Sequence, residues 1–420
     1  MQFSQVVQKD ARTYTFTLSN SHVTYANTLR RLMLTGVETI AFRSDMTATG
    51  TTSDVTVKRN DTPMTNEMLA DRIGLLPIHV KEPNAWKENN YTFILSMTGE
   101  KDKVTYVKSE HFVVSDGSHI GTIPVDDDEE KKEEPRRVPT EMFFPKNPLT
   151  NDTCLIASLQ PGNGLVQQAI EIVAKASKGT GREHARFCPV SQCTYEYTPD
   201  SNPERIQEMF LKWLAVAKKV TEFNKESERY KELWREFNTM QVKRCFLLNE
   251  KGEPFSFNFT VESVGVLDVP YIVNRACEVG ENICSRYVNM QTGKLPDDVI
   301  ITPSDSRIFG FDFLFQKHDH TLGNLLQTWL VEHHIEGEDK PEITYAGYSV
   351  PHPLRDEMIL RVGIKDGEES VARLAVAMAA RGCQAMFQNL RVQWNAALGT
   401  PLVKKTAPTI RKPRIVSAAT

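Results

Sequence analysis

The sequence has no long apolar run, few cysteines and no large net charge, and each of these absences removes a class of protein. No stretch of the 420 residues approaches the roughly 20 consecutive apolar residues that span a bilayer, so we predict no membrane role. Residues 1–16 lack the apolar run behind a basic start that marks a secretory signal. The seven cysteines are scattered without CxxC spacing, which predicts reduced thiols and neither a disulfide framework nor a structural zinc site.

The charge balance argues against direct binding of a nucleic acid by the whole surface. The formal net charge is −4, so we expect any nucleic acid to be held by a partner. Two local charge runs remain, the acidic stretch 126–137 and the basic tail 401–420. We interpret them as a solvated loop and a flexible terminus, with a tail that touches DNA or a partner as the alternative.

A long-range repeat is the main feature present. The segment SHVTYANTLRRLML (21–34) resembles HDHTLGNLLQTWLV (318–331), and aligning Asn27 with Asn324 gives an offset of 324 − 27 = 297. The same offset, without a gap, pairs Tyr14 with Phe311, Phe16 with Phe313, Thr24 with Thr321 and Leu29 with Leu326. Apolar residues alternate upstream of each segment, so each half predicts a strand, a polar turn and a helix. Chance similarity between two common strand-turn-helix units is the competing interpretation.

The predicted helices carry apolar stripes that can pack on each other. A further helical pattern at 366–399 has a stripe too long for one short strand pair, so it also needs a partner helix. Two such halves joined back to back give an α+β fold with an approximate two-fold axis. The residues predicted for the shared core are Tyr25, Asn27, Leu29, Leu32, Leu322, Asn324, Leu326, Trp329, Leu374 and Met378.

These segments resemble the alpha-like subunits of multisubunit DNA-dependent RNA polymerases. ANTLRRLMLTGVETIAF (26–42), TNEMLADRIGLLPIHV (65–80) and KGTGREHARFCPV (178–190) are similar to blocks of the third subunit of eukaryotic RNA polymerase II. DHTLGNLL (319–326) and YAGYSVPHPLRDEMILRV (345–362) resemble its eleventh subunit. The resemblance implies two subunits joined in one chain, an arrangement associated with large cytoplasmic DNA viruses. Linkage would remove an association cost of about 4 to 15 kcal/mol.

The chain departs from this family pattern in two places. The family's cysteine-rich zinc loop has no counterpart in 81–90, so we expect no zinc there. Where the family usually has a short linker, residues 203–240 form an extra segment with an apolar helical face. That segment packs on its own insert domain or receives a partner, and the sequence leaves both open.

Several local motifs suggest chemistry without completing it. The HDH triplet at 318–320 is a candidate metal site, but hydroxyl and carboxylate groups that cap a helix explain it better. The KGTGREH segment lacks the ending of a P-loop, so contact with another subunit is the preferred interpretation. His184 and Cys188 have no orienting third group, and we predict no catalytic residues, cofactor or metal.

Adjacent arginines on the first helix are better candidates for function. Arg30 and Arg31 cannot both lie on the core stripe, so at least one is free to fork onto a carboxylate or a carbonyl of a partner. The competing interpretation is an exposed, solubilising pair. Together with the family blocks, this predicts a partner interface at Arg30, Arg31, Arg72, Arg182 and His184.

These observations combine into one expected organisation. Residues 1–44 and 243–300 form the dimerisation half that resembles the third subunit, 301–400 form the other half, and 45–242 form a β-rich insert domain. We expect a non-catalytic assembly platform of an RNA polymerase that binds the second-largest, the largest and small zinc-binding subunits. It meets DNA only through the complex and needs no homodimer. The expected location is the virion and the host cell for a viral protein, and otherwise the nucleus. A cleft enzyme that uses His184 or His320, or a stand-alone interaction protein, is the alternative.

Overall fold

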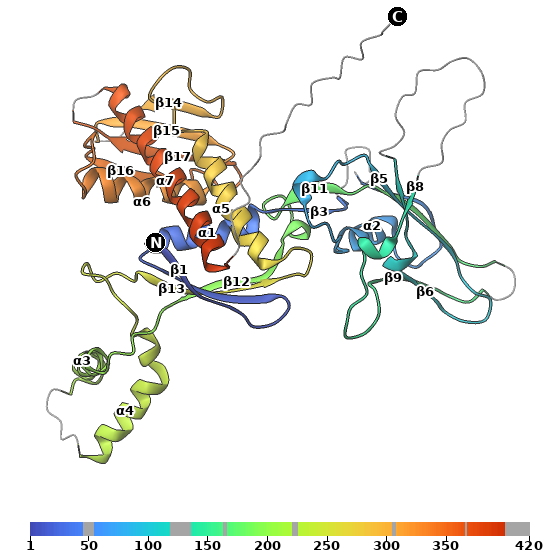
Figure 1. Ribbon diagram of the computed structural model, residues 1–420, viewed down its shortest axis with the longest axis horizontal. Helices are drawn as coiled ribbons and strands as arrows, with labels where there is room; N and C mark the ends of the chain where they lie inside the picture. The colour runs from blue at the N-terminus through green and yellow to red at the C-terminus, as the bar shows by residue number, and fades with distance from the viewer. Residues whose placement is uncertain are drawn as a thin grey trace, which may run out of the picture.

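The computed structural model describes residues 1–44, 54–117, 136–162, 166–220, 226–304, 308–365 and 368–399. Residues 126–135 of the acidic stretch 126–137 and the basic tail 401–420, for which expectations were stated above, lie outside these residues, whereas Arg136 and Arg137 belong to a short strand. Figure 1 shows a body that contains both ends of the described chain, an insert domain at one side and a helical hairpin that projects below. In the described parts, no helix combines the length and the apolar character needed to cross a bilayer.

The body contains two antiparallel sheets of four strands with the same order. The first has the order β1-β2-β13-β12, formed by Gln2–Gln8, Thr13–Ser19, Ser256–Ser263 and Val190–Tyr197. The second has the order β14-β15-β17-β16, formed by Val299–Pro303, Gly310–Gln316, Glu357–Gly363 and Tyr345–Ser349. The predicted α+β class is therefore observed, and each half supplies one sheet.

The offset found in the sequence maps one half onto the other element by element. Adding 297 to the bounds of β2 gives 310 and 316, the bounds of β15, and adding it to Val23 gives His320. The helices of the two halves are α1 (Val23–Thr35), α5 (Val269–Ser285), α6 (His320–Leu330) and α7 (Glu369–Ala397). The N-caps correspond as well, because 22 + 297 = 319: His22 Nδ1 accepts from the Thr24 N–H (3.1 Å) and Asp319 Oδ1 from the Thr321 N–H (2.8 Å).

The two halves share one hydrophobic core. A single cluster of buried side chains runs from Phe3 in β1 to Trp394 in α7 and includes residues of all four helices. The Trp394 ring lies edge-on to Phe3 (5.2 Å between centroids) and Phe16 (5.0 Å), and its Nε1–H donates to the Pro270 carbonyl (3.1 Å). The last helix of the second half thus packs on the sheet of the first, which satisfies the long stripe predicted for 366–399.

The buried face of α7 differs from the predicted one. Leu374 and Met378 are only half-buried, so their assignment to the core was wrong. The face toward α5 and α6 is lined by alanines, Gly382, Cys383 and Phe387, and a Cβ on Gly382 would lie 2.2 Å from the Trp329 ring. Small residues let these helices approach each other closely. The face of α7 that packs on the other helices is therefore the one with small side chains, and not the one with Leu374 and Met378.

The insert domain is β-rich and has its own core. A five-stranded sheet has the order β4-β10-β5-β7-β8, formed by Val55–Asn60, Ala169–Ala174, Tyr91–Thr98, Val113–Asp116 and Arg136–Val138. Two strand pairs and one helix complete it: β3 (Glu38–Ala41) with β11 (Ser177–Thr180), β6 (Thr105–Lys108) with β9 (Leu155–Leu159), and α2 (Asn66–Gly74). Its aromatic centre consists of Phe42, Phe93, Phe112, Phe143 and Phe144.

The extra segment 203–240 forms a helical hairpin. Helix α3 (Pro203–Trp213) continues as a π-helical turn, Leu214–Lys218, and α4 (Glu228–Met240) packs across it, so that Figure 1 shows α3 end-on and α4 along its length. Buried Phe210, Leu214 and Phe237 make a small core of its own.

A second π-helical turn, Val331–Ile335, extends α6. Short 3₁₀ turns lie at Pro83–Ala85, Ser109–His111, Thr140–Met142, Ala185–Phe187 and Val242–Arg244.

The structure divides the chain differently from the expected domain boundaries. Strand β12, expected inside the insert 45–242, is the edge strand of the first body sheet, paired with β13. Strand β3, expected in the half 1–44, pairs with β11 of the insert domain. The boundary expected between 300 and 301 cuts through β14. The first two differences arise because strand pairing joins segments distant in sequence, and the alternation of apolar residues along a strand does not identify the strand that pairs with it.

Candidate assembly interface

Helices α1 and α6 meet across the pseudo-two-fold axis through matched polar contacts. Arg31 Nε donates to Thr321 Oγ1 (2.8 Å), and Thr328 Oγ1 donates to Thr24 Oγ1 (3.0 Å). These two contacts are equivalent, because 31 + 297 = 328 and 24 + 297 = 321. Asn324 Nδ2 adds a bond to Thr24 Oγ1 (3.3 Å). The halves therefore pair as an isologous interface does, within one chain.

Most of the predicted apolar core residues flank these contacts. Tyr25, Leu29, Leu32, Leu322 and Leu326 are buried, and Trp329 packs partly buried against the same core. The Tyr25 hydroxyl donates to Glu332, and burial together with that bond raises the pKa of Tyr25.

Asn27 does not join the interface between the halves. Its Oδ1 accepts from Arg30 Nε (3.0 Å), and both side chains line an outer groove.

Two of the predicted partner residues, Arg31 and Arg182, form ion pairs between the two halves of the chain. Arg31 Nη2 lies 3.2 Å from Asp319 Oδ2, and Arg182 pairs with Asp356, so both guanidinium groups join the first half to the second. Burial alone would raise the pKa of Asp319, but hydrogen bonds from Thr321 and the charges of Arg182 and Arg31 hold it below its usual value. Arg30 is therefore the arginine of the adjacent pair that remains directed away from the core.

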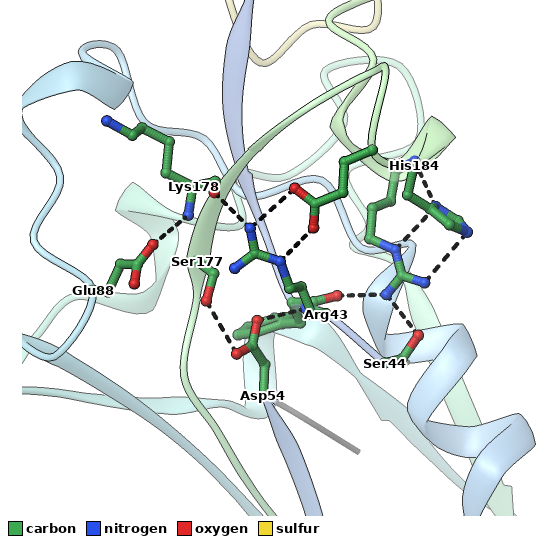
Figure 2. A network of polar contacts seen from close by, with 10 residues as sticks. Arg43, Ser44, Asp54, Glu88, Ser177, Lys178 and His184 are labelled. Carbon is green, nitrogen blue, oxygen red and sulfur yellow. Dashed lines mark hydrogen bonds and ion pairs between the residues drawn. The ribbon is translucent and has the colours of Figure 1, made fainter. Parts of the chain in front are cut away.

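The KGTGREH segment is an internal brace, shown in Figure 2. Arg43, next to β3, donates to the Lys178 carbonyl (2.8 Å) and pairs with Glu183 (2.5 Å), whose pKa this arginine lowers. A Cβ on Gly181 would lie 2.3 Å from the Leu34 carbonyl oxygen, so glycine is required where the loop crosses the end of α1. Gly181 thus allows close packing on the backbone of α1, and Gly179 leaves room for the Phe187 ring.

His184 helps to hold this brace. Its Nδ1 accepts from the backbone N–H (3.1 Å) and the Nε (3.0 Å) of Arg186, which itself donates to the Phe42 carbonyl (2.8 Å) and Ser44 Oγ (2.6 Å), as Figure 2 shows. The Cys188 thiol instead donates to the Leu34 carbonyl (3.3 Å). The geometry therefore does not pair His184 with Cys188 as base and nucleophile.

The histidines of the HDH triplet point to different partners. His318 is buried and its Nε2 lies 2.7 Å from the Tyr287 hydroxyl, which also donates to Asp298 Oδ2 (2.6 Å). His320 Nδ1 lies 3.3 Å from the Tyr348 hydroxyl. Within the described residues, no group of three His, Cys, Asp or Glu side chains is placed to hold a metal ion.

The environment of His318 predicts a pH-dependent stability. Burial lowers the pKa of His318 to about 4, although the Asp298 carboxylate opposes this. The unfolded value is about 6.5, so the neutral side chain stabilises the fold fully above that pH, and this is lost as the pH falls towards 4. We expect the free energy of unfolding to drop by about 2 kcal/mol between pH 7.5 and pH 5 through this residue alone.

Urea unfolding at the two pH values measures this effect. His318→Gln should reduce the pH dependence by about that amount, whereas His352→Gln, at an exposed position, should leave it unchanged. Equal pH dependence in the wild-type chain and His318→Gln would contradict the assignment.

Arg72 lies on an exposed apolar face of the insert domain. Its guanidinium donates to the Leu155 carbonyl (3.2 Å), next to Met68 and Leu75 on the same side of α2. Met68, Leu75 and Leu155 are 59%, 66% and 43% exposed. We name Met68, Arg72, Leu75 and Leu155 the α2 face. Exposed apolar side chains around a guanidinium make this face a candidate interaction surface.

Sequence reasoning missed the threonine partners in the matched contacts and the internal ion pairs. Thr321 and Thr328 could have been found from the sequence, because adding the offset of 297 to Thr24 and Arg31 gives these two positions. The pair between Arg275 on α5 and Glu38 on β3 (2.7 Å) has no local signal, since the partners lie 237 positions apart.

Comparison with known proteins agrees with this architecture. The sequence matches the RNA polymerase Rpb3/Rpb11 dimerisation domain over residues 15–284 and again over residues 311–393. It is 24% identical to DNA-directed RNA polymerases I and III subunit RPAC1 of Bos taurus over 327 residues, which is 68% of this chain and 83% of that protein. It is 28% identical to DNA-directed RNA polymerase subunit Rpo3 of Methanobrevibacter smithii over 196 residues, 44% of this chain and 54% of that protein. The chain therefore belongs to the RNA polymerase Rpb3/Rpb11 dimerisation domain family and is homologous to the alpha-like subunits of multisubunit DNA-directed RNA polymerases.

Proposed function

We propose that this chain is a non-catalytic assembly platform of a multisubunit DNA-directed RNA polymerase, in which one polypeptide does the work of two subunits. The observation that carries the proposal is the single core from Phe3 to Trp394, to which both halves contribute. A covalently joined pair fixes the stoichiometry of the halves and needs no second copy to fill the surface through which they pair.

The proposal assigns polymerisation chemistry to other chains. His184 and His320, the histidines on which a cleft enzyme would depend, are held by Arg186 and Tyr348. We propose two outer surfaces of the described residues as protein-binding surfaces. They are the α2 face and the groove beside Arg30.

The proposed partners are the second-largest and largest polymerase subunits and small zinc-binding subunits. DNA is met only through the complex. In the proposed order of assembly, the second-largest and small subunits bind first, and the largest subunit then completes the active cleft. We assign the α2 face to one of these partners because its exposed apolar side chains surround a guanidinium, a combination common at interface centres.

Co-expression with the largest and second-largest subunits of the same source tests the platform. We expect the wild-type chain to co-purify with both. The double variant Arg72→Glu with Leu75→Asp should lower recovery of at least one partner about tenfold or more, because it places charge at an apolar contact. Val216→Asp is the matched control, since Val216 is 81% exposed on the separate helical hairpin.

Two outcomes would count against the proposal. Failure of the unaltered chain to recover either large subunit leaves only a stand-alone interaction protein. Nucleotide transfer by the purified chain alone would favour the enzyme.

We base the proposed origin and location on the presence of both halves in one chain. We propose a large DNA virus as the source, with the protein in the virion and the host cell, and the nucleus as the location for a cellular source. Mass spectrometry of intact polymerase from purified particles tests this. The chain should be found there at one copy beside the large subunits, and its absence from the particles would contradict the viral assignment.

A further inference from the structure

Strand β12 has an open outer edge. Among the described residues its one partner strand is β13, and the Thr198 N–H beyond its end donates to the Ser256 carbonyl (3.0 Å). In an antiparallel ladder the residues that face the partner strand alternate, and the register is continuous from Gln192 to Tyr197. Tyr195, three positions before Thr198, therefore directs its backbone N–H and carbonyl away from β13.

The second half has an equivalent strand edge, on β16, but there the outward N–H is hydrogen-bonded to a side chain. Tyr195 lies opposite Phe259, which pairs with Phe16, while Tyr348 lies opposite Leu360, which pairs with Phe313. Since 16 + 297 = 313, Tyr348 is the counterpart of Tyr195. Its N–H donates to the side-chain Oε1 of Gln327 on α6 (2.9 Å). The second half thus caps its own edge with a side chain.

In the first half, the position equivalent to that accepting side chain holds a side chain that can only donate hydrogen bonds. Because 30 + 297 = 327, the counterpart of Gln327 is Arg30. A guanidinium has no acceptor atom, so it cannot accept from the Tyr195 N–H. Its Nε donates to Asn27 (3.0 Å), and among the described residues no bond is found for its terminal nitrogens. An outward N–H and a guanidinium therefore lie side by side, and both need an acceptor.

A groove of about 790 Å³ lies over this edge. Arg30 and Lys243 contribute two cations to its lining, and Glu196 contributes one carboxylate. Tyr197 and Phe246 form an aromatic wall with ring centroids 4.8 Å apart. A strand edge, an excess of cations and aromatic side chains are the features that select an extended, acidic polypeptide.

We propose that an extended acidic segment of another polypeptide binds here as a fifth strand on the outer edge of β12. One of its backbone carbonyls accepts from the Tyr195 N–H, and a carboxylate next to it pairs with Arg30 and Lys243. The inference rests on the proposed function, because the segment would belong to another polymerase subunit. It assigns opposite roles to equivalent positions, since Gln327 closes one half and Arg30 leaves the other open to a partner.

Purified full-length chain and synthetic peptides test the edge directly. The probe is a fluorescein-labelled, acetylated ten-residue peptide that alternates threonine with glutamate. One control alternates threonine with lysine, and another carries N-methyl groups on alternate backbone amides, which block strand pairing. We expect binding of the first peptide alone, weakened by salt.

Arg30→Gln is the informative variant because Gln327 shows that glutamine fits this geometry and closes the edge. It should weaken binding of the glutamate peptide about tenfold or more, and Lys243→Gln should weaken it severalfold. Gln327→Arg is the converse variant and should create a second binding site for the peptide. Hydrogen exchange adds a readout specific to the edge, since the Tyr195 amide should be protected by the peptide, and by Arg30→Gln without peptide.

The inference is overturned if Arg30→Gln binds the glutamate peptide as the wild-type chain does. It is overturned equally if the lysine or N-methylated peptide binds as well as the probe, or if protection falls outside β12. The proposed function is judged by recovery of the large subunits with the unaltered chain, so the two proposals fail separately.

Discussion

Trp394→Ala should lower the free energy of unfolding by about 3–5 kcal/mol, because it removes a fully buried indole and leaves a cavity. Trp394 has 0% exposed surface and contacts Phe3 and Phe16 at the far end of the chain. The lost Nε1 bond also leaves the Pro270 carbonyl without that donor. The side chain thus joins the last helix of the second half to the first sheet.

Urea unfolding followed by far-UV circular dichroism measures the change. Val392→Ala is the control on the same helix, because Val392 is 47% exposed, and it should change stability by less than about 0.5 kcal/mol. If both variants changed stability alike, α7 would not be packed on the first half. Because the two halves share one core, Trp394→Ala should also weaken assembly with the large subunits.

Arg275→Met should destabilise the chain by about 3–5 kcal/mol, since it leaves a poorly hydrated carboxylate without its partner. Arg275 forms two bonds to Glu38 (2.9 and 2.7 Å) and lies 2.8 Å from Glu278, and its side chain is only 12% exposed. Glu38 begins β3, which leads into the insert domain, whereas Arg275 belongs to α5 of the body. The pair fixes the position at which the insert leaves the body.

A double-mutant cycle separates the pair from the loss of the side chain. Adding Glu38→Gln to Arg275→Met should recover part of the stability, because Glu38 then no longer carries a charge that has lost its arginine. Lys251→Met breaks the exposed ion pair with Glu336 and should cost at most about 1 kcal/mol. A cost for Arg275→Met no larger than that of Lys251→Met would show that the buried geometry is not maintained in solution.

Residues of the candidate interface illustrate how far pattern reasoning reaches. The stripe of Tyr25, Leu29 and Leu32 follows from helical periodicity, which is a property of neighbouring residues, and these side chains are buried. The adjacent arginines could be placed off the stripe, but not assigned separately. Which of them joins the two halves depends on Thr321 and Asp319, about 290 positions away, which bind Arg31 and leave Arg30 at the groove.

The sequence by itself determined that two related strand-turn-helix halves exist and that their apolar stripes must be buried against a partner. Both follow from the spacing of residues along the chain, since amphipathic periodicity and a repeated segment can be read without knowing the fold. The tertiary structure alone decided three further points. They are the pairing of β12 with β13, the burial of the alanine face of α7 in place of Leu374 and Met378, and the closing of one sheet edge by Gln327 while Arg30 leaves the other open. The physical reason is the same for each: strand pairing, helix approach and hydrogen-bond satisfaction are settled between segments that meet only after the chain has folded.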